Sequence, residues 1–177
     1  MPIKKKCEKN PSEHHFKGND GILRFASGEP LMAECIELIS DILKAENYEE
    51  KTCPFDKEMA LNLDRVEIKK KKGSSRDKTV DFVVCLEKDW LLLVEAKLDV
   101  DNVANIAKSI IKKIEYSKLL LQSCGNFCHT EEEKVVLLKN RNYQQQSNKL
   151  RKLLMAKDWQ IIPYRVCDFY ERYFISP

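Results

Sequence analysis

Three segments of the chain carry apolar residues at every third or fourth position, which is the spacing of an amphipathic helix. These segments are 30–43, 103–121 and 143–155. Ser27 and Pro30 suit the start of the first segment. Asp101 or Asn102 suits the N-cap of the second, and Gly125 follows its end. We therefore expect a first helix of about four turns, a long second helix and a basic third helix.

Two short apolar runs, 78–86 and 90–98, are separated only by Glu87-Lys88-Asp89. Runs rich in Val, Leu and Phe that are joined by so short a polar link indicate a β-hairpin. The second run begins with five apolar residues without interruption, from Trp90 to Val94. This strand should therefore be covered on both faces and lie centrally in its sheet.

Three weaker patterns complete the predicted sheet. Segment 57–70 alternates loosely, 135–138 is a short apolar run, and 159–166 must accommodate Pro163, which favours an edge strand. The element order is then helix, three strands, helix and strand, followed by a further helix and strand. We predict a single α/β domain over 28–177, with a mixed sheet flanked by helices. Polar residues without a period predict a flexible N-terminal arm over 1–27.

The composition fits one folded domain that does not enter a membrane. Hydrophobic residues make up 43% of the 177, and Gly and Pro together number 11 (5 plus 6), so the chain can bury a core. Its longest apolar run is far shorter than the roughly 20 residues of a membrane-spanning helix. Seven cysteines, an odd number and mostly isolated, argue against a disulfide framework. We expect a cytoplasmic protein.

The charge is unevenly distributed, although the net charge is only +3. One basic tract spans 69–78, and another spans 139–157 without any acidic residue. Two such tracts on a nearly neutral protein suit a polyanion such as nucleic acid, and the alternative is that both are solvated surfaces. The candidate nucleic-acid contacts are Lys70, Lys71, Lys72, Arg76, Gln145, Lys149, Arg151 and Lys152.

The predicted hairpin contains three charged residues that need an explanation: Asp81, Glu95 and Lys97. If its turn centres on Lys88, positions whose numbers sum to 176 face each other, so Asp81 lies opposite Glu95. Two carboxylates about 5 Å apart repel by roughly 3 kcal/mol at an effective dielectric constant near 20. Either Mg²⁺ bridges them or Lys97 neutralises them, and a turn one residue longer would move Asp81 to the other face.

Asp81, followed fourteen residues later by Glu95-Ala96-Lys97 on hydrophobic strands, resembles the PD-(D/E)XK nuclease superfamily, which includes restriction endonucleases and Holliday junction resolvases. The resemblance covers roughly 28–138, and Val80 stands where the family has proline. It implies a restriction-endonuclease-like core of order αβββαβ, to which the last helix and strand are added.

The resemblance also implies a site and a reaction. Asp81, Glu95 and the Ala96 carbonyl would hold Mg²⁺ or Mn²⁺, Lys97 would assist the attacking water, and Glu34 on the first helix would complete the site, with Glu37 as its rival. The reaction would be phosphodiester hydrolysis in nucleic acid, with DNA the favoured substrate. Relatives that cut two strands suggest a homodimer. The alternative function is a non-catalytic module that keeps the fold and binds nucleic acid or protein.

Three further groups are assigned structural roles. The segment from Cys124 to His129 offers three soft ligands, but its spacing matches no standard zinc motif, so we interpret the cysteines as packing or loop residues. His14 and His15 are interpreted as surface residues of the arm. Aromatic residues gather near the C-terminus, where they suit core packing or a subunit interface; they are Tyr164, Phe169, Tyr170, Tyr173 and Phe174.

Overall fold

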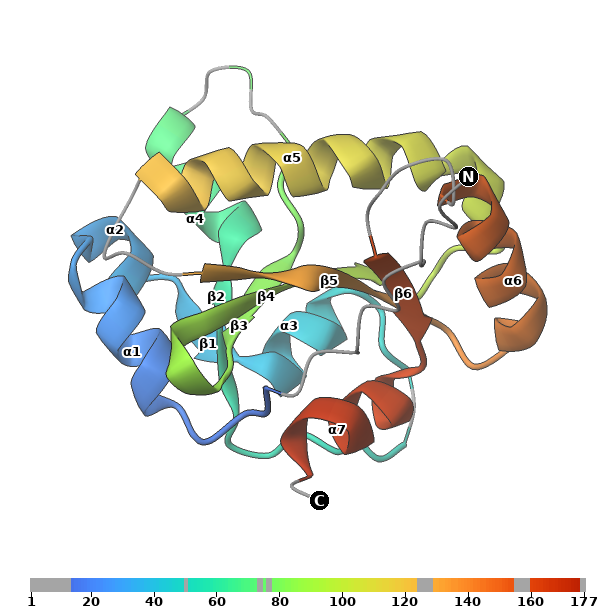
Figure 1. Cartoon of the computed structure of the whole chain (residues 1–177), viewed down its shortest axis with the longest axis horizontal. Coiled ribbons are helices and arrows are strands. Elements are labelled where there is room, and N and C mark those ends of the chain that lie inside the picture. Colours follow the sequence, from blue (N-terminus) through green and yellow to red (C-terminus); the bar gives the residue numbers. More distant parts are fainter. Residues whose placement is uncertain are drawn as a thin grey trace, which may run out of the picture.

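A six-stranded mixed sheet forms the centre of the computed structural model, which describes residues 14–49, 51–72, 75, 78–123, 129–154 and 160–175 (Figure 1). Its strands follow one another in chain order, antiparallel from β1 to β4 and parallel from β4 to β6. The strands are β1 (Ile36–Leu38), β2 (Met59–Asn62), β3 (Phe82–Cys85), β4 (Trp90–Lys97), β5 (His129–Leu138) and β6 (Gln160–Tyr164). The predicted α/β class with a mixed, helix-flanked sheet is confirmed.

Helices cover both faces of this sheet. One buried cluster joins it to α1 (Asp20–Ser27), α2 (Pro30–Ala33), α4 (Leu63–Lys71), α5 (Ala107–Ser123) and α6 (Tyr143–Leu154). A second cluster joins the opposite face to α3 (Ile39–Ala45) and α7 (Val166–Phe174), which lie below the sheet in Figure 1. Short 3₁₀ turns precede β4 (η1, Glu87–Asp89) and α5 (η2, Val103–Asn105). Within the described part of the chain, no helix has the length and apolar character needed to cross a bilayer.

The β3–β4 hairpin has the register that the sequence predicts. Phe82 pairs with Val94 and Cys85 with Leu91, so paired positions sum to 176. Lys88 and Asp89 both have positive φ, 58° and 62°, which closes the tight turn. β4 is buried along both faces, which confirms its central place.

Two predictions for the C-terminal half, an edge strand at Pro163 and an N-cap at Asn102, are also confirmed. Pro163 lies in β6, the last strand of the sheet, which pairs with β5 on one side only. A residue without a backbone N–H is tolerated in such an edge strand. Asn102 caps η2 by accepting a hydrogen bond from the Ala104 N–H at 3.1 Å. The long helix therefore starts where its N-cap predicts, after one 3₁₀ turn.

The single helix predicted over 30–43 is wrong. The segment forms α2, then strand β1, then α3. Its apolar residues serve two layers, because Met32 packs in the cluster on one face of the sheet and Ile42 in the cluster on the other. A periodic pattern cannot distinguish one continuous apolar face from two faces used in succession.

The strand predicted over 57–70 is correct only for its first part. After β2 the chain turns into α4, because the Asn62 side chain caps that helix by accepting from the Arg65 N–H at 3.1 Å. Leu63 and Val66, three positions apart, are both buried. The order αβββαβ therefore holds only if α4 is an insertion between β2 and β3, and if β1 and α3 are additions before them.

The predicted flexible arm is wrong for its described part, residues 14–27. α1 buries Ile22, Phe25 and Ala26, and the Phe16 N–H donates to the Tyr173 carbonyl at 2.8 Å. Residues 1–13 lie outside the described part. Four of the C-terminal aromatic residues lie in α7, which was not predicted, and Tyr164 lies in β6. Phe169 and Tyr173 of α7 are buried within the chain. Core packing is therefore confirmed for these two, and they are not available to a subunit interface.

Candidate active site

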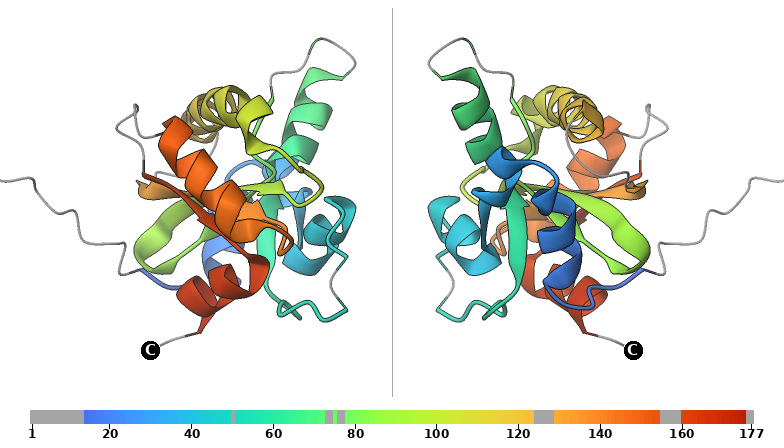
Figure 2. Two further views of the ribbon diagram at one scale, coloured as in Figure 1. Left: turned by 90° about the vertical axis from the view of Figure 1, so that its right-hand side faces the viewer. Right: turned by 90° about the vertical axis from the view of Figure 1, so that its left-hand side faces the viewer.

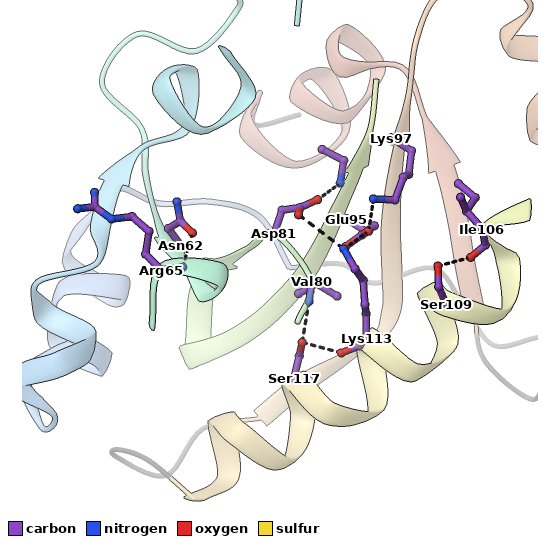
Figure 3. A network of polar contacts seen from close by, with 11 residues as sticks. Asn62, Arg65, Val80, Asp81, Glu95, Lys97, Ile106, Ser109, Lys113 and Ser117 are labelled. Carbon is purple, nitrogen blue, oxygen red and sulfur yellow. Dashed lines mark hydrogen bonds and ion pairs between the residues drawn. The ribbon is translucent and has the colours of Figure 1, made fainter. Parts of the chain in front are cut away.

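Asp81 lies at the bend that leads into β3, next to the pair formed by Phe82 and Val94. Its side chain turns toward β4, where its Oδ2 accepts a hydrogen bond from the Ala96 N–H at 2.6 Å (Figure 3). Asp81 and Glu95 thus lie together at the open end of the β3–β4 hairpin, opposite its turn, as the hairpin register requires. Only 8% of Asp81 is exposed.

Two neighbouring helices fix the position of Asp81. The Val80 N–H donates to the Ser117 hydroxyl on α5 at 2.9 Å, and that hydroxyl donates to the Lys113 carbonyl at 2.7 Å. The Leu63 N–H at the start of α4 donates to the Asp81 carbonyl at 3.1 Å. The carboxylate is therefore held by backbone anchors on both sides as well as by β4.

Glu95 is 1% exposed, and its two oxygens differ sharply. Oε1 lies 2.6 Å from the ammonium nitrogen of Lys97 and 2.6 Å from that of Lys113. Oε2 is buried and has no hydrogen-bond partner among the described residues. The Lys113 ammonium also lies 3.8 Å from Asp81 Oδ1, so it stands between the two carboxylates (Figure 3).

The electrostatics of the site follow from this crowding. Burial raises the pKa of Asp81 to about 7, helped by the charge of Glu95 and opposed by Lys113, the Ala96 N–H and Lys97. For Lys97, burial lowers the pKa, but the ion pair with Glu95 and the charges of Asp81 and Glu46 outweigh it, so the pKa is raised. Lys97 therefore carries its positive charge at neutral pH.

Sequence reasoning missed two residues of this site, and each left a signal. Lys113 lies on α5 between Ile110 and Ile114 and one turn before the buried Ser117, so a lysine in a buried apolar stripe was the available signal. Glu46 is the half-buried C-cap of α3, and its sequence context gave a weaker signal. Burial and the charge of Asp81 raise the pKa of Glu46, which places this carboxyl group within the field of the site.

The structure does not bring the expected helix glutamate to the site. The Glu34 side chain is 65% exposed and pairs with Lys69 at 2.7 Å. Its rival Glu37 accepts from the Asn62 amide at 2.7 Å and forms an ion pair with Arg65. Because the segment is not one helix, neither side chain points along a helix face toward Asp81, and the assignment of Glu34 is corrected.

The oxygens available to a cation come from Asp81, Glu95 and Ala96. Within the part of the chain that the structure describes, Asp81 Oδ1 has only the 3.8 Å contact to Lys113, and Glu95 Oε2 has no hydrogen bond. The N–H and C=O of one strand residue face the same neighbour, so the Ala96 carbonyl faces the side where Asp81 lies. Among the described residues, no group of three or more His, Cys, Asp or Glu side chains is arranged to hold a metal ion. The donor set is thus two carboxylates and a carbonyl, which suits Mg²⁺ completed by water.

The two basic tracts do not line one groove. α4 contacts the C-terminal half of α5, where the Tyr116 hydroxyl donates to Glu67, whereas α6 contacts η2, where the Val103 N–H donates to Gln146. Figure 2 shows α4 and α6 on opposite sides of α5. Of the candidate contacts, all but Lys71 and Arg76 are exposed; these exposed residues are Lys70, Lys72, Gln145, Lys149, Arg151 and Lys152. Lys71 is half-buried, 3.9 Å from Glu67, and Arg76 lies outside the described residues.

A groove of about 610 Å³ opens at the edge where β4 and β5 end. Leu98, which follows Lys97, and Asn47, which follows Glu46, both line it. Its basic side chains are Lys51, Lys139 and Arg141, of which Lys139 pairs with Asp101. The groove is therefore basic, and it contacts the site through the chain neighbours of Lys97 and Glu46, since Asp81, Glu95 and Lys97 are not among the described residues that line it.

Of the remaining sequence candidates, the described residues His14 and His129 lie at the other end of β4, near Trp90. Cys124 and Cys128 are outside the described residues. His14 is part-buried and bonds to Glu131 Oε1 at 2.7 Å, so it is not a loose surface residue. His129 stacks on Trp90 with ring centroids 4.9 Å apart.

Comparison with known proteins gives no match to any family model, curated protein or solved structure.

Proposed function

We propose that this protein is a divalent-metal-dependent nuclease of the PD-(D/E)XK kind, which hydrolyses phosphodiester bonds in nucleic acid, with DNA the expected substrate. One observation carries the proposal. Two buried carboxylates, at the start of β3 and on β4, each have one oxygen held by the protein and the other without a hydrogen bond to the described residues, beside the half-buried ammonium group of Lys97. The order of β2, β3, β4, α5 and β5 supports a restriction-endonuclease-like core, with α4 inserted.

The side chains have distinct roles in this proposal. Asp81 and Glu95, with the Ala96 carbonyl, would hold Mg²⁺ or Mn²⁺. The bound ion would polarise the phosphate and lower the pKa of a water molecule. Lys97, charged and 17% exposed, would donate hydrogen bonds to the attacking water or to the oxygens that gain charge as the phosphate reacts.

The groove beside the site supports a polyanionic substrate. Lys51 and Arg141 are exposed on its walls, which also include Leu98, the residue after Lys97. Backbone phosphates of a nucleic acid are the ligands that such side chains contact.

A second candidate function is favoured by the same lysines. Lys97 and Lys113 both lie 2.6 Å from Glu95, so the charge of Glu95 is balanced by the protein alone. This arrangement also suits a non-catalytic module that binds nucleic acid or a protein partner. Binding that is salt-sensitive, independent of metal and never followed by cleavage would favour it.

The deciding experiment measures cleavage of plasmid, single-stranded and branched DNA and of RNA, with Mg²⁺, Mn²⁺ or a chelator. We expect metal-dependent cleavage that Asp81→Asn and Lys97→Ala each reduce at least about a hundredfold. Matched controls are Asp89→Asn in the hairpin turn and Lys44→Ala on α3, both exposed and both expected to retain activity. Cleavage that survives both site substitutions would remove the proposal.

A further inference from the structure

The ammonium group of Lys113 stands where the two carboxylates converge. Its nitrogen lies 2.6 Å from Glu95 Oε1 and 3.8 Å from Asp81 Oδ1, and its side chain is 14% exposed (Figure 3). Lys97, by contrast, forms an ion pair with Glu95 alone among the described residues. Lys113 is therefore the group whose charge compensates the repulsion between Asp81 and Glu95.

The surrounding helix explains why a lysine can be held there. Ile110, Ile114 and Ser117 on α5 are buried, so this stretch of the helix packs against the sheet over β3 and β4. The Lys113 stem runs from that buried stripe toward the carboxylates, where its charge replaces solvent. The ion pairs of Lys113 therefore place a positive charge against both buried carboxylates.

We propose that Lys113 is a resident counter-ion that competes with a divalent cation for Asp81 and Glu95, and so sets the affinity of this site for metal. The inference rests on the proposed function, because it concerns the cation that function needs. A dication that contacts both carboxylates would lie within a few ångströms of the Lys113 nitrogen, and like charges at that distance repel strongly in a buried site. The four-carbon stem of lysine allows the ammonium to swing away by a change of rotamer.

If Lys113 competes with the cation, its loss should raise the affinity of the site for metal, whereas the loss of a residue that supports metal binding should lower that affinity. Removing the ammonium should strengthen metal binding, because Asp81 and Glu95 are then left with a single compensating lysine. If Lys113 instead only positions Glu95, its removal should weaken metal binding. The sign of the change separates the two roles.

The experiment measures Mn²⁺ binding by electron paramagnetic resonance and calorimetry, without substrate, for the wild-type protein, Lys113→Met and Lys112→Met. Lys112 is exposed on the same helix and serves as the matched control. We expect Lys113→Met to bind Mn²⁺ at least about tenfold more tightly, Lys112→Met to bind as the wild type does, and Asp81→Asn added to Lys113→Met to abolish the gain. Circular dichroism checks the fold, and Lys113→Gln replaces Lys113→Met if that variant does not fold.

The outcomes distinguish this inference from the proposed function. Equal or weaker Mn²⁺ binding by Lys113→Met, while the wild type binds Mn²⁺ and cleaves DNA, overturns the competition and leaves the nuclease intact. A wild type and a Lys113→Met variant that both fail to bind Mn²⁺ and to cleave overturn the proposed function, and the inference with it.

Discussion

The two ends of the central parallel strands both bury charged side chains, but they satisfy them differently. At the candidate site, the ammonium groups of Lys97 and Lys113 balance the charges of Asp81 and Glu95, and no described residue forms a hydrogen bond with Glu95 Oε2. At the other end, the β5 residues Glu131, Glu133 and Lys134 form what we call the closed cluster. His14 bonds to Glu131 at 2.7 Å, and the Tyr173 hydroxyl donates to Glu133 Oε2 at 2.6 Å. Lys134 donates to the carbonyl oxygens of Glu131 and Glu132.

This difference shows which buried charges point to chemistry. A buried charge is costly unless it is paired and hydrogen-bonded, and the closed cluster meets that condition with a tyrosine, a histidine and backbone carbonyls. Burial lowers the pKa of Lys134 to about 7, yet its ammonium donates hydrogen bonds to the backbone carbonyl oxygens of Glu131 and Glu132. Burial and an unusual pKa therefore occur at both ends. The feature that distinguishes the candidate site from the closed cluster is the carboxylate oxygen Glu95 Oε2, which has no hydrogen-bond partner among the described residues.

The largest expected effect compares one glutamate from each end. Glu95→Gln should reduce the rate of metal-dependent DNA cleavage by about a thousandfold, because a neutral amide is a poor ligand for a hard cation. Glu133→Gln should leave the rate within about threefold of the wild type, since its partner is Tyr173 and not the site. Single-turnover cleavage rates test both variants. Equal losses in the two would mean that the ends do not differ in function.

The second prediction concerns stability and pH at the candidate site. Asp81 has an ordinary pKa of 3.8 and a pKa of about 7 in the fold, where burial is the main cause, so the folded protein binds its proton more tightly. The stabilisation that this tighter proton binding adds to the free energy of unfolding is therefore complete below pH 4 and is lost as the pH rises toward 7. The asparagine in Asp81→Asn has no proton to lose. The free energy of unfolding of this variant, relative to the wild type, should therefore rise from pH 4 to pH 8, by at most about 4 kcal/mol.

Urea unfolding at several pH values measures this advantage. Asp89→Asn is the matched control, because Asp89 is exposed and its left-handed backbone suits asparagine. Its difference from the wild type should change little over the same range. A flat profile for Asp81→Asn would contradict the crowding that the structure gives to this carboxyl group.

The smallest expected effect tests the closed cluster. Tyr173→Phe removes the hydroxyl that donates to the buried Glu133, and should lower the free energy of unfolding by about 1–3 kcal/mol, because the carboxylate loses a donor it cannot replace with water. Tyr170→Phe, on the same helix and only half-buried, should cost less than about 0.5 kcal/mol. Thermal or urea melts compare the two. A Tyr173→Phe variant as stable as Tyr170→Phe would show that the closed cluster does not depend on this bond.

Local chain geometry was enough to find the first part of the site. The turn between β3 and β4 is short, so its length sets the register, and the register alone places Asp81 beside Glu95. The Lys97 ammonium follows because side chains alternate along β4. These relations involve neighbours within one hairpin, and no packing of distant elements can change them while the hairpin exists.

Tertiary packing decided the rest. Lys113 reaches Glu95 only because the crossover helix α5 packs over the hairpin, and Glu46 enters the field of Asp81 only because α3 crosses to the opposite face. The same crossing divides the segment 30–43 between two layers and keeps Glu34 away from the site. A hydrophobic pattern reports that a residue is buried, but the layer in which it is buried depends on contacts between elements far apart in the chain.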